Sequence, residues 1–308
     1  MKSLLFGNHD KQPMLGLGTW QISPEKITSL LPQALKKGYR HIDCAAIYGN
    51  EKEVGKALQE AFSQGIVTRD ELWITSKLWC NAHRQDEVIP ALDKTLNDLQ
   101  LDYLDLYLMH WPVAIKAEKL FPDVGEDIWS PKEVPLSETW LAMNKTVESG
   151  KCRHVGVSNF STKKIARLIE ETDIVPEVNQ VELHPYLQQP KLVDFCQQHN
   201  IHITAYSPLG RADKALLDHP VITEIASDYQ STPAQIILAW EMQRGFAVIP
   251  KTVRIERLEE NLGAVAFTLS SGEMASIDAL DKHHRYVTVS LWTLPGSPYA
   301  QASAVWDE

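Results

Sequence analysis

The alternation of short apolar runs with longer amphipathic stretches is the feature that most constrains the fold of this chain. Eight runs rich in β-branched or apolar residues are predicted to be strands: residues 15–20, 40–43, 72–77, 104–110, 154–158, 178–183, 202–207 and 246–250. Stretches with helical spacing lie between them, at residues 24–37, 51–62, 85–99, 136–149, 162–171, 190–198 and 232–244. Strands and helices that alternate in this way form βα units around a parallel sheet.

Eight such repeats in about 250 residues fit one closed (β/α)8 barrel better than two open sheets. Two further helices are expected after the eighth strand, at residues 256–262 and 271–282. An irregular tail rich in Trp, Tyr and Pro follows, and we expect residues 283–308 to contribute to a substrate pocket. No Ser/Gly-rich linker or charge block divides the chain, so the sequence predicts a single domain over residues 1–308.

Composition argues against several classes of partner. The chain carries 30 basic and 40 acidic residues, and a surface of that sign repels the phosphates of nucleic acid. No apolar run is long enough to span a membrane, and the one at the start is too short for a secretory signal. The cysteines, Cys44, Cys80, Cys152 and Cys196, show no CxxC pairing and are expected to be reduced. We therefore expect a cytoplasmic monomer with no nucleic-acid or membrane partner.

Polar residues stand where several of the predicted strands end. A (β/α)8 barrel carries its chemistry at the carboxyl ends of its strands. The second, third and fourth strands end at Asp43, Lys77 and His110, and later strands bring Ser158, Asn159, Gln180, Tyr206, Ser207, Lys251 and Thr252 to the same end. A salt bridge at the rim is the commoner explanation for any one of them. The convergence of so many on one mouth favours a functional site.

These groups suit the reduction of a carbonyl. Asp43 and Lys77 form a natural ion pair on neighbouring strands, and Tyr48 can reach back over the mouth. An ammonium beside a phenol stabilises the phenolate, so we expect the pKa of Tyr48 to be lowered from about 10 towards the physiological range. Such a tyrosine can donate a proton to a developing alkoxide, and neutral His110 can orient the same oxygen. The hydride must come from a cofactor, and a nicotinamide supplies it.

Five collinear motifs resemble the aldo-keto reductases. They are residues 38–45 (GYRHIDCA) with Tyr48 and residues 51–55 (EKEVG), residues 75–79 (TSKLW), residues 108–112 (LMHWP), residues 155–160 (VGVSNF), and residues 249–252 (IPKT) with Arg257, Glu260 and Asn261. The resemblance implies a barrel that uses NADPH, or less favourably NADH, to reduce aldehydes or ketones. It also implies that Tyr48 is the general acid, that Lys77 and Asp43 tune it, and that His110 orients the carbonyl.

The resemblance further implies a cofactor site. Thr19, Trp20 and Asp43 would lie by the nicotinamide, Tyr206 would stack on it, and Ser158, Asn159 and Gln180 would hold its carboxamide. Lys251, Thr252 and Arg257 would bind the adenosine 2′-phosphate, and Glu260 and Asn261 the adenine. Ser207, Leu209 and Val253 would be further contacts. The segment 207–214 is shorter than the cofactor clamp of the mammalian aldose reductase pattern, which predicts faster cofactor release.

The substrate pocket is less clearly marked. Trp20, Trp79 and Trp111 follow the first, third and fourth strands and suit the walls of an apolar slot beside His110, although packing under a loop is the alternative. Ile47, Phe121 and Trp292 are further candidates for the pocket. His283 and His284 have no third ligand at a recognisable spacing, so we expect surface histidines and no metal site.

Three functions remain open at this stage. The leading hypothesis is an NADPH-dependent aldehyde reductase that also takes some ketones. An aldose or xylose reductase is close behind, because the polarity of the pocket cannot be deduced from the sequence. The third is a catalytically idle subunit that binds NADPH. The presence of Asp43, Tyr48, Lys77 and His110 together argues against idleness.

Overall fold

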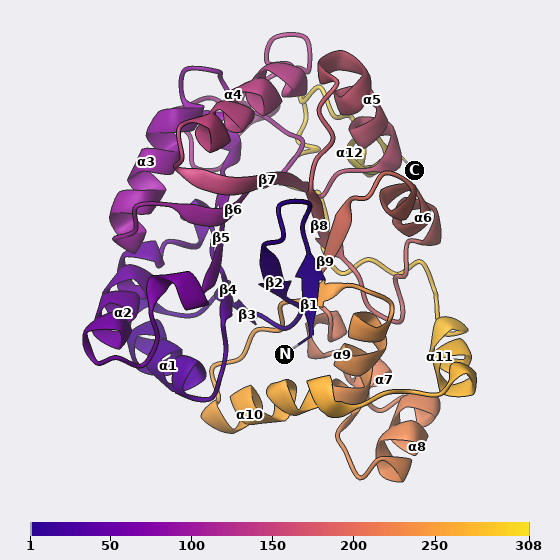
Figure 1. Ribbon diagram of the computed structural model, residues 1–308. Coiled ribbons are helices and arrows are strands. Elements are labelled where there is room, and N and C mark those ends of the chain that lie inside the picture. Colours follow the sequence, from indigo (N-terminus) through magenta and orange to yellow (C-terminus); the bar gives the residue numbers. More distant parts are fainter. Residues whose placement is uncertain (1, 308) are drawn as a thin grey trace.

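A computed structural model describes residues 2–307 of the chain, and its centre is an eight-stranded parallel sheet (Figure 1). The strands are β3 Leu17–Gly18, β4 His41–Asp43, β5 Trp73–Leu78, β6 Leu104–Met109, β7 Cys152–Ser158, β8 Val178–Glu182, β9 His202–Tyr206 and β10 Ala247–Val248. Each pairs in parallel with its neighbours in chain order. All eight predicted strands are therefore present, within a few residues of the expected bounds.

The sheet closes on itself between its first and last strands. Leu15 forms a parallel bridge with Val248, and the Gly16 N–H donates to the Val248 carbonyl at 2.8 Å. Gly18 is needed at this seam, because a Cβ atom on it would lie 2.8 Å from the Ile249 carbonyl oxygen. The chain thus forms a (β/α)8 barrel, as the sequence predicts. Close packing at the seam shortens the first and last strands to two residues each.

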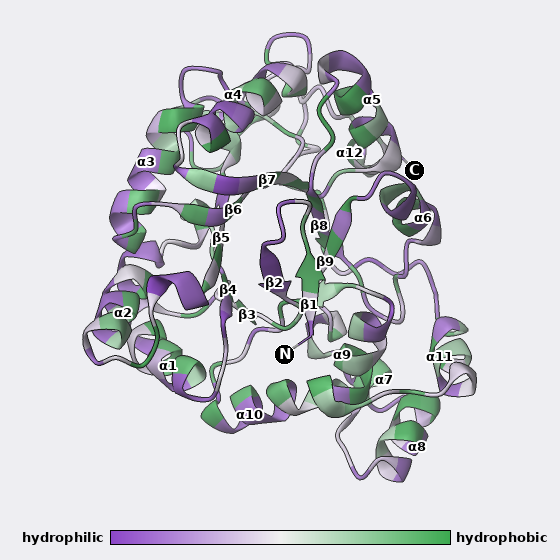
Figure 2. Cartoon of the chain, viewed as in Figure 1, coloured by the Kyte–Doolittle hydropathy of each residue, from purple (hydrophilic) through white to green (hydrophobic). Residues whose placement is uncertain are grey.

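Helices surround the barrel and turn an apolar stripe towards it (Figure 2). Eight of them are α1 Pro24–Lys36, α2 Glu51–Ser63, α3 Val88–Leu99, α4 Leu136–Glu148, α5 Thr162–Thr172, α6 Pro190–Gln198, α9 Pro233–Gln243 and α10 Ile255–Gly263. Helix α3 begins three residues later than predicted. Pro90 explains the difference, because a proline fits only the first turn of a helix. Among the described residues no helix is long and apolar enough to cross a membrane.

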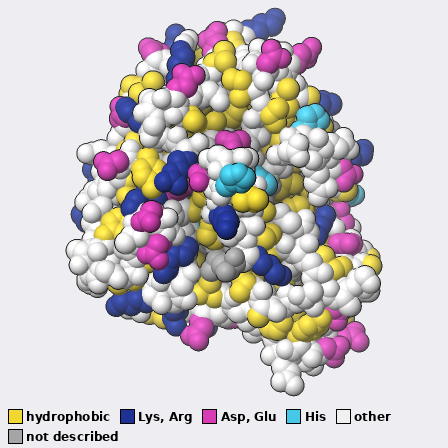
Figure 3. Space-filling view, in the orientation of Figure 1, with side chains coloured by type: hydrophobic (Ala, Val, Ile, Leu, Met, Phe, Trp, Pro, Cys, Tyr) yellow, Lys and Arg dark blue, Asp and Glu magenta, His cyan; other side chains and the backbone are white. Residues whose placement is uncertain are grey.

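Two short helices, α7 Lys214–Leu217 and α8 Pro220–Asp228, lie between β9 and α9 and were not predicted. An N-terminal hairpin was also missed: β1 Ser3–Leu5 pairs antiparallel with β2 Lys11–Pro13. Figure 1 views the barrel from the end that this hairpin covers, and Figure 3 shows histidine and basic side chains near the centre of the same face. We call this end the base and the opposite end, where the strands finish, the mouth.

The tail, residues 283–307, returns across the mouth end of the barrel. It follows α11 Ser271–Asp278 and ends in α12 Ala302–Trp306, a helix where the sequence predicts irregular structure. Lys164 holds this end: its ammonium donates to the Val305 carbonyl at 2.8 Å and pairs with Asp307 at 2.6 Å. Figure 1 shows α12 lying beside α5. Val305 of α12 is fully buried, and this packing stabilises a helix that is too short to form by local propensity alone.

Candidate active site

A fully buried ammonium lies at the centre of the mouth. Lys77, near the end of β5, has no exposed surface, and its Nζ donates to the Asp43 carboxylate at 2.6 Å, the Cys44 carbonyl at 2.8 Å and the Tyr48 hydroxyl at 3.4 Å. Three donors thus find three acceptors. Burial acts to lower the pKa of Lys77, but the Asp43 carboxylate beside it more than compensates and the pKa is raised. The predicted ion pair is present, and Lys77 stays charged at neutral pH.

The phenol of Tyr48 lies at the edge of this network. Tyr48 ends a short 3₁₀ turn, Ala46–Tyr48, that follows β4 and turns the ring back over the mouth. The prediction of a lowered pKa is wrong: burial is the largest cause, it outweighs the favourable charge of Lys77, and the pKa of Tyr48 is raised to about 12. The phenol therefore holds its proton at neutral pH. The charge of Lys77 makes loss of that proton less costly, but it does not bring the pKa of Tyr48 back to its ordinary value.

His110 is the third polar group at this point. It follows β6, its ring centroid lies 5.8 Å from that of Tyr48, and the two rings meet edge to face. Burial, and secondarily the charge of Lys77, lower the pKa of His110 well below its ordinary value, so the imidazole is neutral. Its Nδ1 is buried with no hydrogen-bond partner among the described residues. The described residues thus leave one nitrogen of this ring unbonded.

A second network surrounds Asp43 and joins four more of the predicted residues. The Gln180 amide donates to the free oxygen of the Asp43 carboxylate at 2.8 Å. Ser158 donates to the Gln180 carbonyl at 2.8 Å, and Asn159 donates to Ser158 at 3.2 Å and to the His110 carbonyl at 2.9 Å. The Tyr206 hydroxyl completes the network by donating to Asn159 at 2.6 Å. Thr19 hydrogen-bonds to the Asp43 backbone from the neighbouring strand.

The predicted phosphate ligands lie at the start of helix α10. Lys251 and Arg257 are exposed, and within the described residues neither forms an ion pair. The first turn of α10 has no side-chain cap, which leaves its N–H groups available, and Thr252 is buried beside it. Two unpaired cations at a helix N-terminus favour a bound anion. These residues fit a phosphorylated nucleotide.

The other predicted cofactor residues lie near this group or along the mouth. Val253 is exposed, Asn261 is buried, and the Glu260 carboxylate accepts a hydrogen bond from Thr232 at 2.8 Å. That bond makes Glu260 part of the packing between α10 and α9 as well as a candidate adenine contact. Ser207 and Leu209 are half-buried in the loop that follows β9.

Aromatic rings from three loops form the wall of the mouth. Trp79 has ring contacts with His110 at 5.2 Å and with Phe121 at 5.8 Å, and its indole N–H donates to the Leu120 carbonyl. Trp20 is 39% exposed. Ile47 is half-buried against the cluster that contains Trp79. The wall is therefore apolar and partly open, which suits a slot for a small organic molecule.

The tail supports this wall from behind. The Trp292 ring lies 5.9 Å from that of Trp79 and 5.8 Å from that of Trp111, and Trp292 is only 2% exposed. Tyr299 donates to the Pro112 carbonyl at 3.1 Å. Trp292 thus fixes the position of the two tryptophans rather than lining the open slot itself. His283 and His284 are both exposed on the surface.

Four residues at the mouth were not predicted. Arg211 stacks its guanidinium 5.1 Å from the Trp20 ring centroid, and Asp213 accepts a hydrogen bond from Tyr286 at 2.5 Å. Glu182, which is completely buried in β8, accepts backbone hydrogen bonds from the tail. Only Glu182 carried a signal in the sequence, because a carboxylate that ends an apolar strand needs partners.

Several known proteins are similar to this chain in sequence and in architecture. The profile of the Aldo/keto reductase family matches residues 14–282. An aldo/keto reductase of Synechocystis is 52% identical over 100% of this chain and 97% of its own length. The aldo-keto reductase family 1 member A1 of Bos taurus is 44% identical over 95% and 93%, respectively. The solved aldose reductase of Schistosoma japonicum matches with a TM-score of 0.90 and 37% identity, over 97% of each chain.

Proposed function

Because this chain belongs to the aldo/keto reductase family, we propose that it reduces aldehydes, and some ketones, to alcohols with a hydride from NADPH. Membership supports an oxidoreductase that acts on carbonyl groups with a nicotinamide cofactor. One observation carries the finer proposal. The Tyr48 hydroxyl, which keeps its proton, lies 3.4 Å from a fully buried ammonium and beside a neutral imidazole with an unused nitrogen.

Each of these groups has a task in the proposed reaction. The nicotinamide, when bound, supplies the hydride to the carbonyl carbon. Tyr48 donates its proton to the oxygen as negative charge develops there, and Lys77 stabilises the phenolate that remains. Asp43 holds the Lys77 ammonium in place, and His110 orients the carbonyl oxygen as a neutral donor. The raised pKa of Tyr48 ensures that the acid is protonated at the start of each turnover.

For the cofactor we propose the two groups of residues described above. Ser158, Asn159 and Gln180 hold the nicotinamide carboxamide, Tyr206 stacks on the ring, and Thr19 and Trp20 complete its surroundings. Lys251, Thr252 and Arg257 bind the 2′-phosphate, with Glu260 and Asn261 at the adenine and Ser207, Leu209 and Val253 as further contacts. The unpaired charges of Lys251 and Arg257 favour NADPH over NADH, because only NADPH carries that phosphate.

The wall of the slot favours apolar aldehydes over sugars. Trp20, Trp79, Trp111, Phe121 and Ile47 offer aromatic and aliphatic surface but few hydrogen-bonding groups, and a site built for a polyol needs such groups. An aldose-type substrate is the second candidate, because the structurally similar protein of Schistosoma japonicum is an aldose reductase. A catalytically idle subunit is the third. It does not account for the placement of Tyr48 beside the buried Lys77 ammonium and the neutral His110 ring.

Turnover by matched variants tests the proposal. NADPH and NADH consumption is measured across aromatic, aliphatic and sugar aldehydes, with wild type beside Tyr48→Phe. We expect turnover of apolar aldehydes with NADPH and a loss of about 10³-fold or more in Tyr48→Phe, with NADPH binding retained. Tight binding of NADPH with no turnover of any substrate would favour the idle subunit instead. Turnover that survives in Tyr48→Phe would remove Tyr48 from the acid role.

We also propose that the enzyme acts as a cytoplasmic monomer with no nucleic-acid or membrane partner. All four cysteines are free and buried, and the formal net charge of −10 is unfavourable for polyanions. Light scattering after size exclusion measures the mass in solution. A mass near 34.8 kDa is expected, and about twice that value would contradict the monomer.

A further inference from the structure

The loop that follows β9 forms a strap beside the mouth, and we define the strap as residues 207–213. It leaves the barrel after Tyr206 and reaches the far side of β10, where Arg211 stacks on the ring of Trp20 at 5.1 Å. The strap therefore bridges two predicted cofactor contacts, Tyr206 and Trp20. Its middle, Gly210–Ala212, is a single 3₁₀ turn, in which the Ala212 N–H donates to the Leu209 carbonyl at 2.8 Å.

The backbone of the strap is in an unfavourable conformation. Ser207, Arg211 and Ala212 have φ angles of 49°, 56° and 60°, and Gly210 between them has 54°. Side chains with a Cβ atom rarely adopt this left-handed region. Such a segment keeps its shape only where its surroundings hold it. The contacts made by Arg211 and Asp213 are among those that hold the strap in this shape.

The tail supplies the second of these contacts. The hydroxyl of Tyr286 donates to the Asp213 carboxylate at 2.5 Å. The edge of the Tyr286 ring also packs on Gly210, where an added Cβ atom would lie 3.1 Å from the ring. The hydrogen bond from Tyr286 is the largest cause of a lowered pKa for Asp213, so the carboxylate is charged when it accepts. Hydrogen bonds to charged groups are the stronger kind.

Tyr286 is itself fixed to the barrel. Glu182, with no exposed surface at the end of β8, accepts the backbone N–H of Tyr286 at 2.7 Å and that of Val287 at 2.9 Å. The same carboxylate accepts from His184 at 3.1 Å, and the His184 ring lies 5.0 Å from the Tyr286 ring. Because a buried carboxylate with three donors is rigid, Tyr286 connects a fixed strand end to a loop whose backbone has several left-handed residues.

We propose that Tyr286 is a positioning residue through which the C-terminal tail holds the strap closed and so sets the rate at which the cofactor is released. The inference rests on the proposed use of NADPH for its functional consequence. The fastening of the strap does not depend on any cofactor. The hydrogen bond from Tyr286 joins the strap to the tail, whereas the sequence predicts a strap that is short and releases the cofactor fast.

Trypsin tests the fastening without a cofactor. Arg211 and Lys214 are exposed and lie within or next to the strap. We expect cleavage after these residues, followed by mass spectrometry, to be about tenfold faster in Tyr286→Phe, because one hydrogen bond to a charged group is lost. Tyr229→Phe is the matched control: the Tyr229 hydroxyl donates to the Glu273 carboxylate at 3.0 Å, away from the strap. Asp213→Asn, which weakens the same bond from the other side, should also accelerate cleavage.

Stopped-flow release of NADPH tests the consequence. We expect the release rate to rise about tenfold in Tyr286→Phe and to stay at the wild-type value in Tyr229→Phe. Equal cleavage of Tyr286→Phe and wild type would overturn the proposal, and so would faster cleavage with unchanged release. Failure of wild type to bind NADPH would instead contradict the proposed function, and the cleavage result would still decide whether the tail fastens the strap. Thermal melting of both variants shows that any change is local.

Discussion

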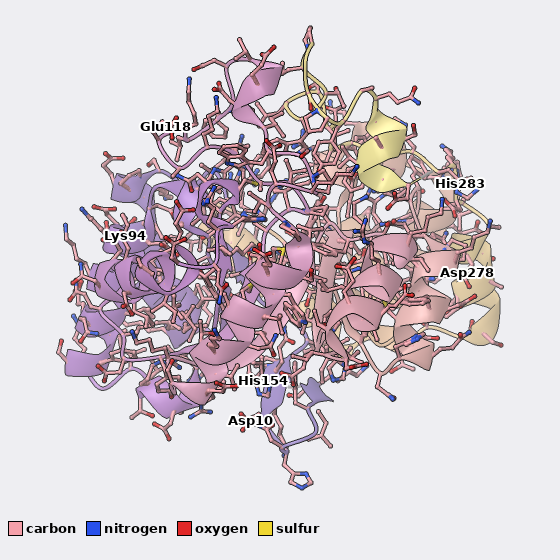
Figure 4. The ribbon with its side chains drawn as sticks, turned by 90° about the horizontal axis from the view of Figure 1, so that it is seen from above. Asp10, Lys94, Glu118, His154, Asp278 and His283 are labelled. Carbon is pink, nitrogen blue, oxygen red and sulfur yellow. The ribbon has the colours of Figure 1, made fainter. Side chains whose placement is uncertain are left out.

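The two ends of the barrel each bury a histidine among aromatic rings, and the two rings differ in their hydrogen bonding and in their charge. At the base, His154 uses both ring nitrogens, towards Glu177 at 2.8 Å and Asp10 at 3.1 Å. At the mouth, His110 Nδ1 has no partner among the described residues. In Figure 4, His154 and Asp10 lie by the hairpin at one end, and Glu118 of the long loop after β6 lies at the other.

The protonation of the two rings follows from this difference. Burial lowers the pKa of both, but at His154 the carboxylates of Glu177 and Asp10 outweigh it and the pKa is raised. His110 instead faces the charge of Lys77, and its pKa falls well below the ordinary value. A structural histidine is thus satisfied and favoured as a cation, whereas the candidate catalytic histidine is neutral and incompletely bonded. The mouth thus holds a neutral ring with an unbonded nitrogen beside the Tyr48 phenol.

Removal of the Lys77 ammonium should have the largest effect, on both stability and turnover. In Lys77→Met the Asp43 carboxylate stays buried without its cation, so we expect the free energy of unfolding to fall by about 3–5 kcal/mol. Turnover of aldehydes should fall by about 10³-fold, because the Tyr48 phenolate is no longer stabilised. Urea unfolding and steady-state kinetics measure the two effects.

Arg167→Met is the control for this prediction. The ion pair of Arg167 with Glu171, at 2.6 Å, joins residues four apart on α5, and the two side chains are 67% and 34% exposed. A pair of that kind contributes about 0.5 kcal/mol or less. Equal losses of stability in the two variants would contradict the view that the mouth depends on its buried ion pair.

His110→Ala separates catalysis from stability. We expect kcat/KM to fall by about 10²-fold, since one oriented donor to the carbonyl oxygen is lost. The free energy of unfolding should change far less than in Lys77→Met, because no buried charge is left unpaired. Steady-state kinetics and urea unfolding of the same preparation measure both. A loss confined to KM would show that His110 binds the ground state and the transition state equally and does not lower the barrier between them.

The barrel itself was predictable because strands buried on both faces are near-continuous apolar runs. The polar groups at the mouth were predictable because each lies within a short local motif at a strand end, as Lys77 does at the end of β5. What failed depends on distance or on burial. Tyr286 and Asp213 are 73 residues apart in the chain, and no local pattern pairs them. The direction of the pKa shift of Tyr48 could not be predicted from the neighbouring charge of Lys77, because burial acts in the opposite direction and is the larger cause.

The hairpin at the base was missed for a related reason. Its strands have three residues each, too few to establish an alternating pattern. The hairpin is instead fixed to the barrel by the ring of Phe6, which follows β1. That ring lies between His154 at 4.4 Å and His202 at 4.6 Å, and 5.0 Å from Trp73. Residues on separate strands thus create the site that fixes the hairpin.

His154→Gln tests the base, where stability but not activity should respond. A histidine whose folded pKa is raised stabilises the fold fully below its unfolded pKa of about 6.5, and this contribution is lost as pH rises through the folded pKa. We therefore expect wild type to exceed the variant by about 1.5 kcal/mol at pH 6 and by less at pH 9. Urea unfolding at both values measures it.

His202→Gln is the matched control, on the other side of Phe6. Burial lowers the pKa of His202, so its contribution to stability should shrink on acidification. A difference between wild type and His154→Gln that does not change with pH would assign His154 to packing alone. Turnover should be unchanged in both variants, because the base lies at the opposite end of the barrel from Tyr48.

The smallest expected effect is the response of turnover to pH. His110 is neutral and the pKa of Tyr48 is about 12, so kcat/KM should be constant between pH 6 and 9.

Glu51 is the group to exclude as a source of pH dependence, because burial raises its pKa to about 7. Its carboxylate accepts from Ser76 at 2.5 Å and from Thr95 at 3.1 Å. Ser76 precedes Lys77 on β5, so the two side chains point to opposite faces of the strand and Glu51 lies outside the mouth. An inflection near pH 7 that disappears in Glu51→Gln would show that this outer face is coupled to the mouth. One that persists in Glu51→Gln would place a titrating group at the mouth itself and contradict the assignment of a neutral His110.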